Sequence, residues 1–190
     1  MMDIETHPWA PFIPDGARLL IMGTFPPGQH RWSMDFYYPN PTNDFWRIMG
    51  LLYLGDKNAL YNASLRRFDL DCIRNLMSEH HIALNDTARA VRRLKGNASD
   101  KYLEIVEPVP LTELLDRMPR CRDIATTGEK AAGVIASLTG TPLPAIGVPV
   151  TTPDGSLRIW RMPSTSRAYP LAIEKKAEIY GSMLRTVGLL

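Results

Sequence analysis

The sequence has few cysteines and no long apolar run. Cys72 and Cys121 lie 49 residues apart without a CxxC motif, which argues against a zinc site or a disulfide scaffold, so we expect two reduced thiols. No apolar run approaches the roughly 20 residues of a membrane helix. Residues 1–16 also lack the basic start and apolar centre of a signal peptide. We therefore expect a cytoplasmic protein that does not contact a membrane.

The net charge is small, and the histidines follow no metal-binding pattern. The 22 Lys and Arg against 20 Asp and Glu leave a net charge of +2, which is too small to indicate a nucleic-acid coat. None of the four histidines stands in an HExxH or similar metal-ligand spacing. The sequence therefore predicts neither a metal site nor a cofactor. The histidines are His7, His30, His80 and His81.

Sixteen prolines and 13 glycines divide the 190 residues into short blocks that alternate between strand and helix patterns. This alternation is typical of an α/β fold with a sheet between helices, and the length suits one domain over residues 1–190, with 1–17 as an N-terminal extension. Expected strands are 18–23, 81–85 and 123–126, with an edge hairpin formed by 148–152 and 157–162. Expected helices are 44–52, 69–79, 112–118, 129–138 and 171–187.

Two loops follow predicted strands at the edge where α/β proteins usually place function: Thr24–Thr42 and the segment after Met162. The first opens with GTFPPG, which has the GxxxxG spacing of a phosphate loop. Gln29 and His30 replace the required Lys and Ser/Thr, and two prolines lack N–H groups, so a nucleoside triphosphatase is excluded. The prolines indicate a rigid turn, or a stiff loop that offers preset groups to a flat ligand.

The segment from Phe36 to Trp46 holds five aromatic residues and two asparagines just before a predicted helix. Phe45 and Trp46 fit the core. A loop tyrosine beside asparagines is typical of nucleobase recognition, because the ring stacks on a base and the amide offers both a donor and an acceptor. For Asn43 the alternative is an ordinary helix cap.

The segment from Met162 to Pro170 places three hydroxyls before the last helix, which favours an anion site or simple Ser/Thr capping. A serine hydrolase using Ser164 or Ser166 would need a histidine base, and no recognisable nucleophile elbow is present.

GTFPP, YYPNPTNDFW and MPSTS, in this order, resemble motifs of the uracil-DNA glycosylase superfamily, most closely the hypoxanthine-DNA glycosylase branch and more distantly the mismatch-specific uracil glycosylases. HIALNDTARAVRR, GNASD and DIATTGEKAA extend the resemblance over about residues 18–187. It implies a three-layer α/β/α domain with a short central, mostly parallel sheet. It also implies a protein that flips uracil, hypoxanthine or xanthine from DNA and hydrolyses its N-glycosidic bond without a metal or cofactor. We expect this protein to act as a monomer.

By this resemblance Asn43 positions the attacking water and Tyr38 stacks on the base. Phe25 stands where several branches have an acidic or amide residue, so Asn43 is the sole candidate for water activation. Asn40 stands where relatives often have histidine, which leaves the preferred base open. The implied pocket residues are Gly23, Thr24, Phe25, Tyr38 and Asn40, and the implied DNA-backbone contacts are Pro163, Ser164, Thr165, Ser166 and Arg167, with Ala168 and Tyr169 facing the gap left by the base.

Two alternatives stay open. A basic cluster could contact phosphates or simply form a solvated helix face. The whole protein could also bind nucleic acid or a nucleobase without catalysis. The cluster consists of Arg89, Arg92, Arg93, Lys95 and Lys101.

Overall fold

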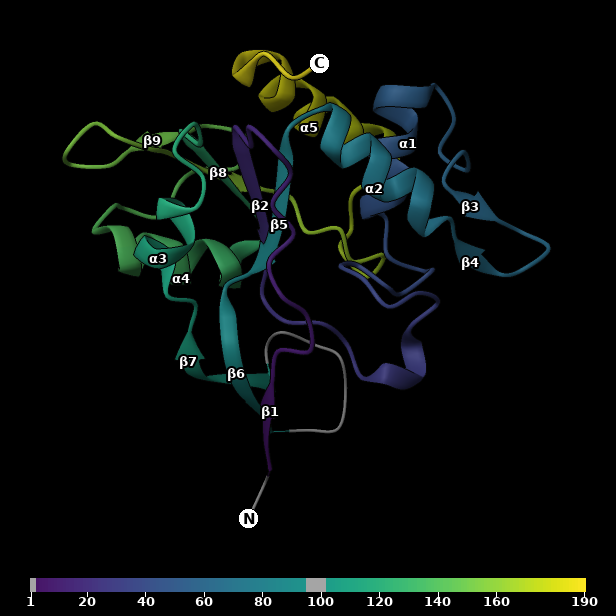
Figure 1. Cartoon of the computed structure of the whole chain (residues 1–190), viewed down its shortest axis with the longest axis horizontal. Coiled ribbons are helices and arrows are strands. Elements are labelled where there is room, and N and C mark those ends of the chain that lie inside the picture. The colour runs from purple at the N-terminus through teal and green to yellow at the C-terminus, as the bar shows by residue number, and fades with distance from the viewer. Residues whose placement is uncertain (1–2, 95–101) are drawn as a thin grey trace.

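The computed structural model describes residues 3–94 and 102–190 and is built around a five-stranded sheet (Figure 1). The strand order is β5-β2-β8-β10-β9, in which the first four strands are parallel and β9 pairs antiparallel with β10. The predicted strands and the edge hairpin are thus confirmed. The bounds are β2 Leu19–Gly23, β5 Ile82–Asp86, β8 Asp123–Thr127, β9 Val150–Thr151 and β10 Arg158–Met162.

Helices cover both faces of this sheet. Alternate residues of a strand point to opposite faces, and both sets are apolar here, so each face needs a covering layer. Leu19 and Ile21 pack with α1, α2 and α5, whereas Leu20 and Met22 pack with α3 and α4. Figure 1 shows these two groups of helices on opposite sides of the sheet. The expected three-layer α/β/α architecture is therefore confirmed. The helices are α1 Phe45–Leu54, α2 Leu70–Glu79, α3 Leu111–Asp116, α4 Glu129–Thr139 and α5 Ile173–Val187.

Local residues mark the starts of two helices, whereas the cap of α1 differs from the one considered for Asn43. The Asp69 carboxylate accepts the N–H of Cys72 at 3.0 Å and caps α2, and Gly128 precedes α4. The N-cap position of α1 is taken by Asp44. Asn43 lies one residue earlier, and its side-chain oxygen accepts the N–H of Phe45 at 2.9 Å.

A second, antiparallel sheet of order β1-β6-β7 was not predicted. It contains β1 Ile4–Thr6, β6 Ala88–Arg93 and β7 Leu103–Pro108. The interpretation of the basic segment as a helix face was wrong, since β6 carries its three arginines. Ala88, Val91 and Leu103 form its apolar cluster, against which Phe25 packs.

The arginines of β6 each pair with a glutamate. Arg92 lies 2.6 Å from Glu104 and Arg89 lies 3.2 Å from Glu107, both glutamates being on β7, while Arg93 lies 2.8 Å from Glu5 on β1. These ion pairs hold the second sheet together and neutralise much of the local positive charge. Lys95, Lys101 and the GNASD motif lie outside the described residues.

The N-terminal segment packs closely on the rest of the fold. β1 pairs with β6, and Phe12 forms an antiparallel bridge with Leu84 of β5. A short 3-10 helix, η1 Gln29–Arg31, lies in the loop after β2, and β3 Tyr61–Asn62 pairs with β4 Arg67–Phe68. Within residues 3–94 and 102–190, no helix is long and apolar enough to cross a membrane.

Candidate functional site

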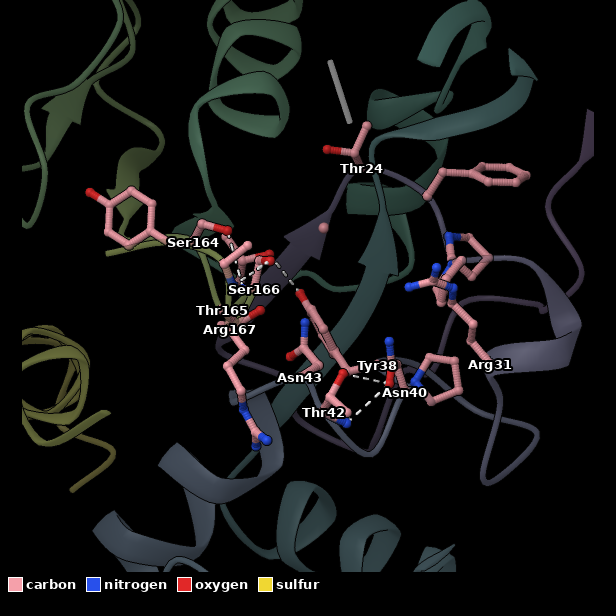
Figure 2. A pocket seen from close by; sticks show the side chains of 18 of the residues that line it. Thr24, Arg31, Tyr38, Asn40, Thr42, Asn43, Ser164, Thr165, Ser166 and Arg167 are labelled. Carbon is pink, nitrogen blue, oxygen red and sulfur yellow. Dashed lines mark hydrogen bonds between the residues drawn. The ribbon is translucent and has the colours of Figure 1, made fainter. Parts of the chain in front are cut away.

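A cavity of about 740 Å³ opens at the carboxyl ends of the parallel strands. Gly23, Asp86 and Thr127 end three of these strands and line the cavity. The loop after β10, with Ser164, Ser166 and Arg167, completes the wall (Figure 2). The two loops singled out in the sequence therefore meet at one site. Of the predicted site residues, the cavity is lined by Gly23, Thr24, Phe25, Tyr38, Asn40, Asn43, Ser164, Thr165, Ser166 and Arg167.

Pro163 is the one predicted site residue that does not line the cavity. It is buried, and its carbonyl oxygen accepts a hydrogen bond from the Tyr180 hydroxyl at 2.9 Å. Tyr180 on α5 thus fixes the start of the Ser164–Ser166 loop. Pro163 therefore lies beneath the cavity surface and anchors this loop to α5. The expected direct contact of Pro163 with DNA does not fit this buried position.

Tyr38 stands in the centre of the cavity wall (Figure 2). Its backbone is left-handed, with φ of 52°, which is rare for a residue other than glycine. Its ring stacks on Phe45 with centroids 3.9 Å apart, and its hydroxyl lies 3.1 Å from Oγ1 of Thr127. Because Phe45 packs against one face of the ring and Thr127 contacts its hydroxyl, the ring is a rigid aromatic surface. Tyr37, in contrast, is buried in the core.

The two asparagines use their carbonyl oxygens locally. Oδ1 of Asn43 accepts the N–H of Phe45, and Oδ1 of Asn40 accepts both the N–H and the hydroxyl of Thr42, at 3.0 and 2.9 Å. An amide oxygen has two lone pairs, so Asn43 retains one acceptor position as well as its NH₂ donors. Asn43 lies between Tyr38 and the Ser164–Arg167 loop (Figure 2). The cap alternative is thus realised in part, while the residue still lines the cavity.

The serines of the loop after β10 hold the backbone of that loop. Ser164 accepts the N–H of Ser166 at 3.2 Å, and Ser166 accepts the N–H of Ala168 at 3.3 Å. In the described ranges 3–94 and 102–190, no histidine hydrogen-bonds to either serine. His7 instead contacts Asp86 and Trp9, and His81 contacts Asp15. The geometry therefore gives no support to a serine hydrolase.

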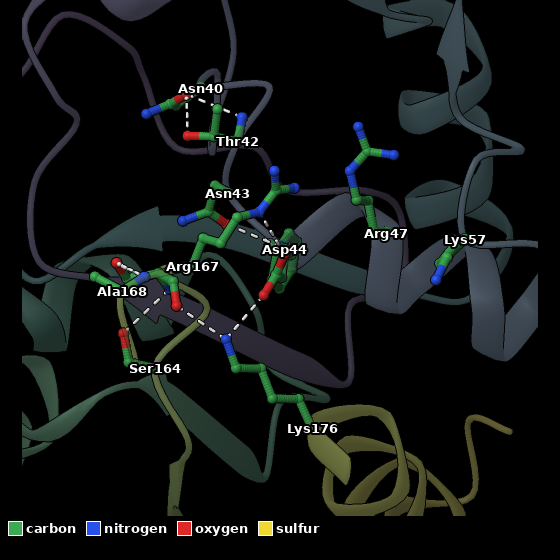
Figure 3. Close-up of polar contacts among 12 residues, drawn as sticks. Asn40, Thr42, Asn43, Asp44, Arg47, Lys57, Ser164, Arg167, Ala168 and Lys176 are labelled. Carbon is green, nitrogen blue, oxygen red and sulfur yellow. Dashed lines mark hydrogen bonds and ion pairs between the residues drawn. The ribbon is translucent and has the colours of Figure 1, made fainter. Parts of the chain in front are cut away.

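A buried ion pair ties this loop to the start of α1 (Figure 3). Nζ of Lys176 is fully buried and lies 2.8 Å from Oδ2 of Asp44 and 2.9 Å from the carbonyl oxygen of Ser166. The Asp44 N–H donates to the carbonyl oxygen of Thr165 at 2.8 Å, and Arg167 Nε lies 3.6 Å from Oδ1 of Asp44. The relative position of Asn43 and Ser166 thus depends on Lys176.

The sequence interpretation missed Asp86 and His7. Asp86 ends β5 and lines the cavity, and its Oδ2 lies 2.9 Å from Nε2 of His7. Burial alone would lower the pKa of His7, but the hydrogen bond and the charge of Asp86 outweigh burial and raise it above 6.5. The one sequence feature that could have indicated Asp86 is its position as an acidic residue at the end of a buried strand. Its partner 79 positions away could not be identified from spacing.

The part of the chain that the structure describes contains no group of three or more His, Cys, Asp or Glu side chains placed to hold a metal ion. The polar groups at the cavity are amides, hydroxyls, one carboxylate and the guanidinium groups of Arg31 and Arg167. The amides, hydroxyls and carboxylate can hydrogen-bond to a flat heterocycle, and the guanidinium groups can bind an anionic group attached to that heterocycle. The cavity volume lies within the range of about 300–1,000 Å³ for small-molecule sites.

No family model matches this chain, and neither does any curated protein. Among solved structures, the fold is similar to the solution NMR structure of a "putative Uracil DNA glycosylase" from Methanosarcina acetivorans. The TM-score is 0.68 and the sequence identity is 20%, over 98% of this chain and 99% of the other. The likeness agrees with the predicted fold over its full length. The resemblance to a hypoxanthine-directed or a mismatch-specific branch stays a prediction.

Proposed function

We propose that this chain is a monofunctional DNA glycosylase of the uracil-DNA glycosylase superfamily, which extrudes a deaminated base from DNA and hydrolyses its N-glycosidic bond. One observation carries the proposal: Tyr38, Asn43 and the Ser164–Ser166 loop line a single cavity at the strand ends. The full-length likeness to the fold of a putative uracil DNA glycosylase supports it. The proposed substrates are uracil, hypoxanthine or xanthine in DNA, and the protein acts as a monomer.

Tyr38 is the proposed stacking platform. An extruded base loses its stacking in the duplex, which costs a few kcal/mol, and a protein ring can replace part of that contact. The contacts of Tyr38 with Phe45 and Thr127 fix the ring before the base arrives. Little conformational entropy is then lost on binding, because the ring is already ordered.

Asn43 is the proposed water-positioning residue. One lone pair of Oδ1 accepts the hydrogen bond from the N–H of Phe45, and the second can accept a hydrogen bond from the attacking water. As the bond between C1′ and the base nitrogen breaks, its electron pair moves to the base and positive charge develops on the sugar. The water oxygen then bonds to C1′ and loses one proton to solvent, and the departing base takes up a proton from solvent, so the products are an abasic sugar with a C1′ hydroxyl and the free base. A positioned water suffices against such an electrophile, so the reaction needs only water as co-reactant.

Exposed residues at the rim are the proposed DNA-backbone contacts. Ser166 and Arg167 are exposed beside the cavity. Arg167 also lines an adjoining hollow of about 470 Å³ with Arg47 and Lys57 (Figure 3). Guanidinium and ammonium groups bind phosphate, and these three cations lie next to the entrance through which a base would pass.

The test uses end-labelled duplexes that carry one uracil, hypoxanthine or xanthine, with alkali to cleave abasic sites. Wild type should excise at least one base, and Asn43→Ala should be slower by about 100-fold or more. Asn43→Asp keeps an acceptor for the Phe45 N–H and should retain activity. Asn75→Ala, on the exposed side of α2, is the matched control. Excision by Asn43→Ala at the wild-type rate would contradict the role of Asn43.

The alternative is a protein that binds a base or nucleic acid without cleavage. The use of Asn43 Oδ1 as a helix-start acceptor favours it, because this bond restrains the amide. That alternative predicts retention of lesion-containing duplexes without strand cleavage, and equal retention by Asn43→Ala.

A further inference from the structure

A second hollow of about 380 Å³ adjoins the cavity and shares Asp86 with it as a wall. We call it the α3 hollow, because α3 and the two residues before it form one side, opposite the N-terminal segment and the end of β5. Its volume lies within the range of about 300–1,000 Å³ for small-molecule sites. The apolar part of its wall consists of Pro11, Ala88, Val109, Pro110 and Leu114.

Trp9 lines the α3 hollow and is only partly buried. Its indole is fixed on the other sides, since its N–H donates to Oδ1 of Asp35 at 2.6 Å and its ring centroid lies 4.7 Å from that of Trp32 and 5.7 Å from that of His7. A ring held in this way is ordered before a ligand arrives, so little conformational entropy is lost on binding. Fixed aromatic side chains are the surfaces on which nucleobases stack.

Asn85 contributes a buried amide to the same hollow. The residue is 6% exposed, and its Oδ1 lies 3.0 Å from the Tyr37 hydroxyl, so that end of the amide is used inside the protein. Among residues 3–94 and 102–190, its NH₂ group has no hydrogen-bond partner. A buried donor without a partner is destabilising, and the carbonyl group of a ligand would satisfy it.

Two arginines give the α3 hollow a cationic edge. Arg89 is exposed and lies 3.2 Å from Glu107, whereas Arg117 is exposed and has no ion-pair partner among the residues that the structure describes. Glu113 lies one helical turn before Arg117 and is the exposed acidic residue of this wall. A guanidinium group that no carboxylate occupies is free to bind a phosphate.

Resting on the proposed function, we propose that the α3 hollow binds a second nucleotide of the DNA strand, in single-stranded form. The base contacts Trp9 and the Asn85 amide, and the phosphate contacts Arg117. A paired base is stacked between its neighbours and cannot enter a hollow, so this nucleotide must be unpaired. Because the cavity and the α3 hollow share Asp86 at the end of β5, one strand can reach both.

The experiment titrates the folded protein and follows backbone amide shifts by NMR. The probes are dCMP, 2-deoxyribose 5-phosphate, inorganic phosphate and a single-stranded tetranucleotide of deoxycytidine, because cytosine is not among the bases proposed for the cavity. dCMP should shift the amides of residues 109–117 and bind about tenfold or more tightly than either phosphate probe. Equal binding of dCMP and inorganic phosphate would overturn the inference.

The tetranucleotide distinguishes a DNA strand from a free mononucleotide. It should bind about tenfold or more tightly than dCMP, because the rest of the strand adds contacts with cations at the rim. A tetranucleotide that binds no more tightly than dCMP would overturn the assignment to a DNA strand.

Three exposed residues allow variants that leave the core intact. Arg117→Gln should weaken dCMP binding by about fivefold or more, since it removes the phosphate partner. Glu113→Gln should strengthen binding by about twofold to threefold, because it removes a like charge near the phosphate. Arg120→Gln, exposed just beyond α3, is the matched control and should bind as wild type does. Unchanged binding by Arg117→Gln, or weaker binding by Glu113→Gln, would overturn the inference.

Excision assays on a single strand with one uracil or hypoxanthine separate this inference from the proposed function. Arg117→Gln should raise KM and leave kcat close to that of wild type. Binding of the cytosine probes in the expected order, without any excision, would support the α3 hollow and reject catalysis. Excision by wild type without dCMP shifts at residues 109–117 would overturn the α3 hollow and leave the glycosylase activity intact.

Discussion

The ammonium group of Lys176 on α5 lies 2.8 Å from the carboxylate of Asp44, and neither side chain is more than a tenth exposed. This pair joins the last helix to the start of α1, between Asn43 and the Ser164–Ser166 loop. Two segments more than 100 residues apart are thereby fixed as opposite walls of one cavity. The buried polar network is part of what positions the site.

Lys176→Met should lower the free energy of unfolding by about 3–5 kcal/mol, because it leaves the buried Asp44 carboxylate without its closest partner. Urea denaturation measures the change. Lys175→Met is the matched control, since Lys175 is exposed and pairs with Glu178 on the surface, and it should unfold close to wild type. The double variant Asp44→Asn with Lys176→Met should recover part of the loss. Equal stability of the Lys176 and Lys175 variants would show that the buried pair contributes nothing.

Gly23→Ala should disrupt the cavity, because the added methyl group would lie 2.7 Å from Oδ1 of Asp86. The expected result is a loss of base binding and of any excision, with a lower free energy of unfolding. Gly133 is exposed on α4, and a Cβ atom added there would meet no atom within 4 Å outside the adjacent helix backbone. Gly133→Ala should therefore stabilise the protein by up to about 1 kcal/mol. Unaltered base binding by Gly23→Ala would place the ligand elsewhere.

The His7–Asp86 pair should make stability depend on pH. The pKa of His7 is raised in the folded protein, so its contribution is fully present below pH 6.5 and is lost as pH rises through the raised pKa. His7→Gln should therefore cost more unfolding free energy near pH ~5.5 than near pH ~8.5. Urea denaturation of both proteins at the two pH values measures this difference, and a larger cost at the alkaline pH would contradict the sign.

The two thiols should differ in reactivity. Burial raises the pKa of Cys121 to about 11, whereas Cys72 is exposed, with its pKa raised by a hydrogen bond to Asp69. A thiol reagent at mildly alkaline pH should modify one site in the folded protein and two in denaturant. Cys72→Ser should leave the folded protein unreactive, and reaction of both thiols at equal rates would contradict the burial of Cys121.

Local patterns were sufficient to predict the central sheet and its helices. The apolar run of β2, the Asp69 cap and the glycine before α4 each act within a few residues. The second sheet was missed because β6 alternates arginines with small apolar residues. Its arginines pair with glutamates on β1 and β7, and one of these contacts spans 88 positions.

The candidate site was predicted unevenly for the same reason. Tyr38, Asn43 and the serine loop stand in unusual local sequences, and the structure brings them to one cavity. Asp86 closes an ordinary strand pattern, and its contact with His7 depends on the fold that brings the two residues together. Pro163 was assigned as a DNA contact through the resemblance of the MPSTS motif, whereas its buried contact with Tyr180 is determined by the packing of α5.

The most direct test of the central claim is to measure the products of wild type acting on a duplex with one uracil or one hypoxanthine. The free base is quantified by chromatography, and the strand is examined before any alkali treatment. The account predicts free base in equal amount to abasic sites in an otherwise intact strand. A folded protein that releases no base from any lesion duplex would contradict it.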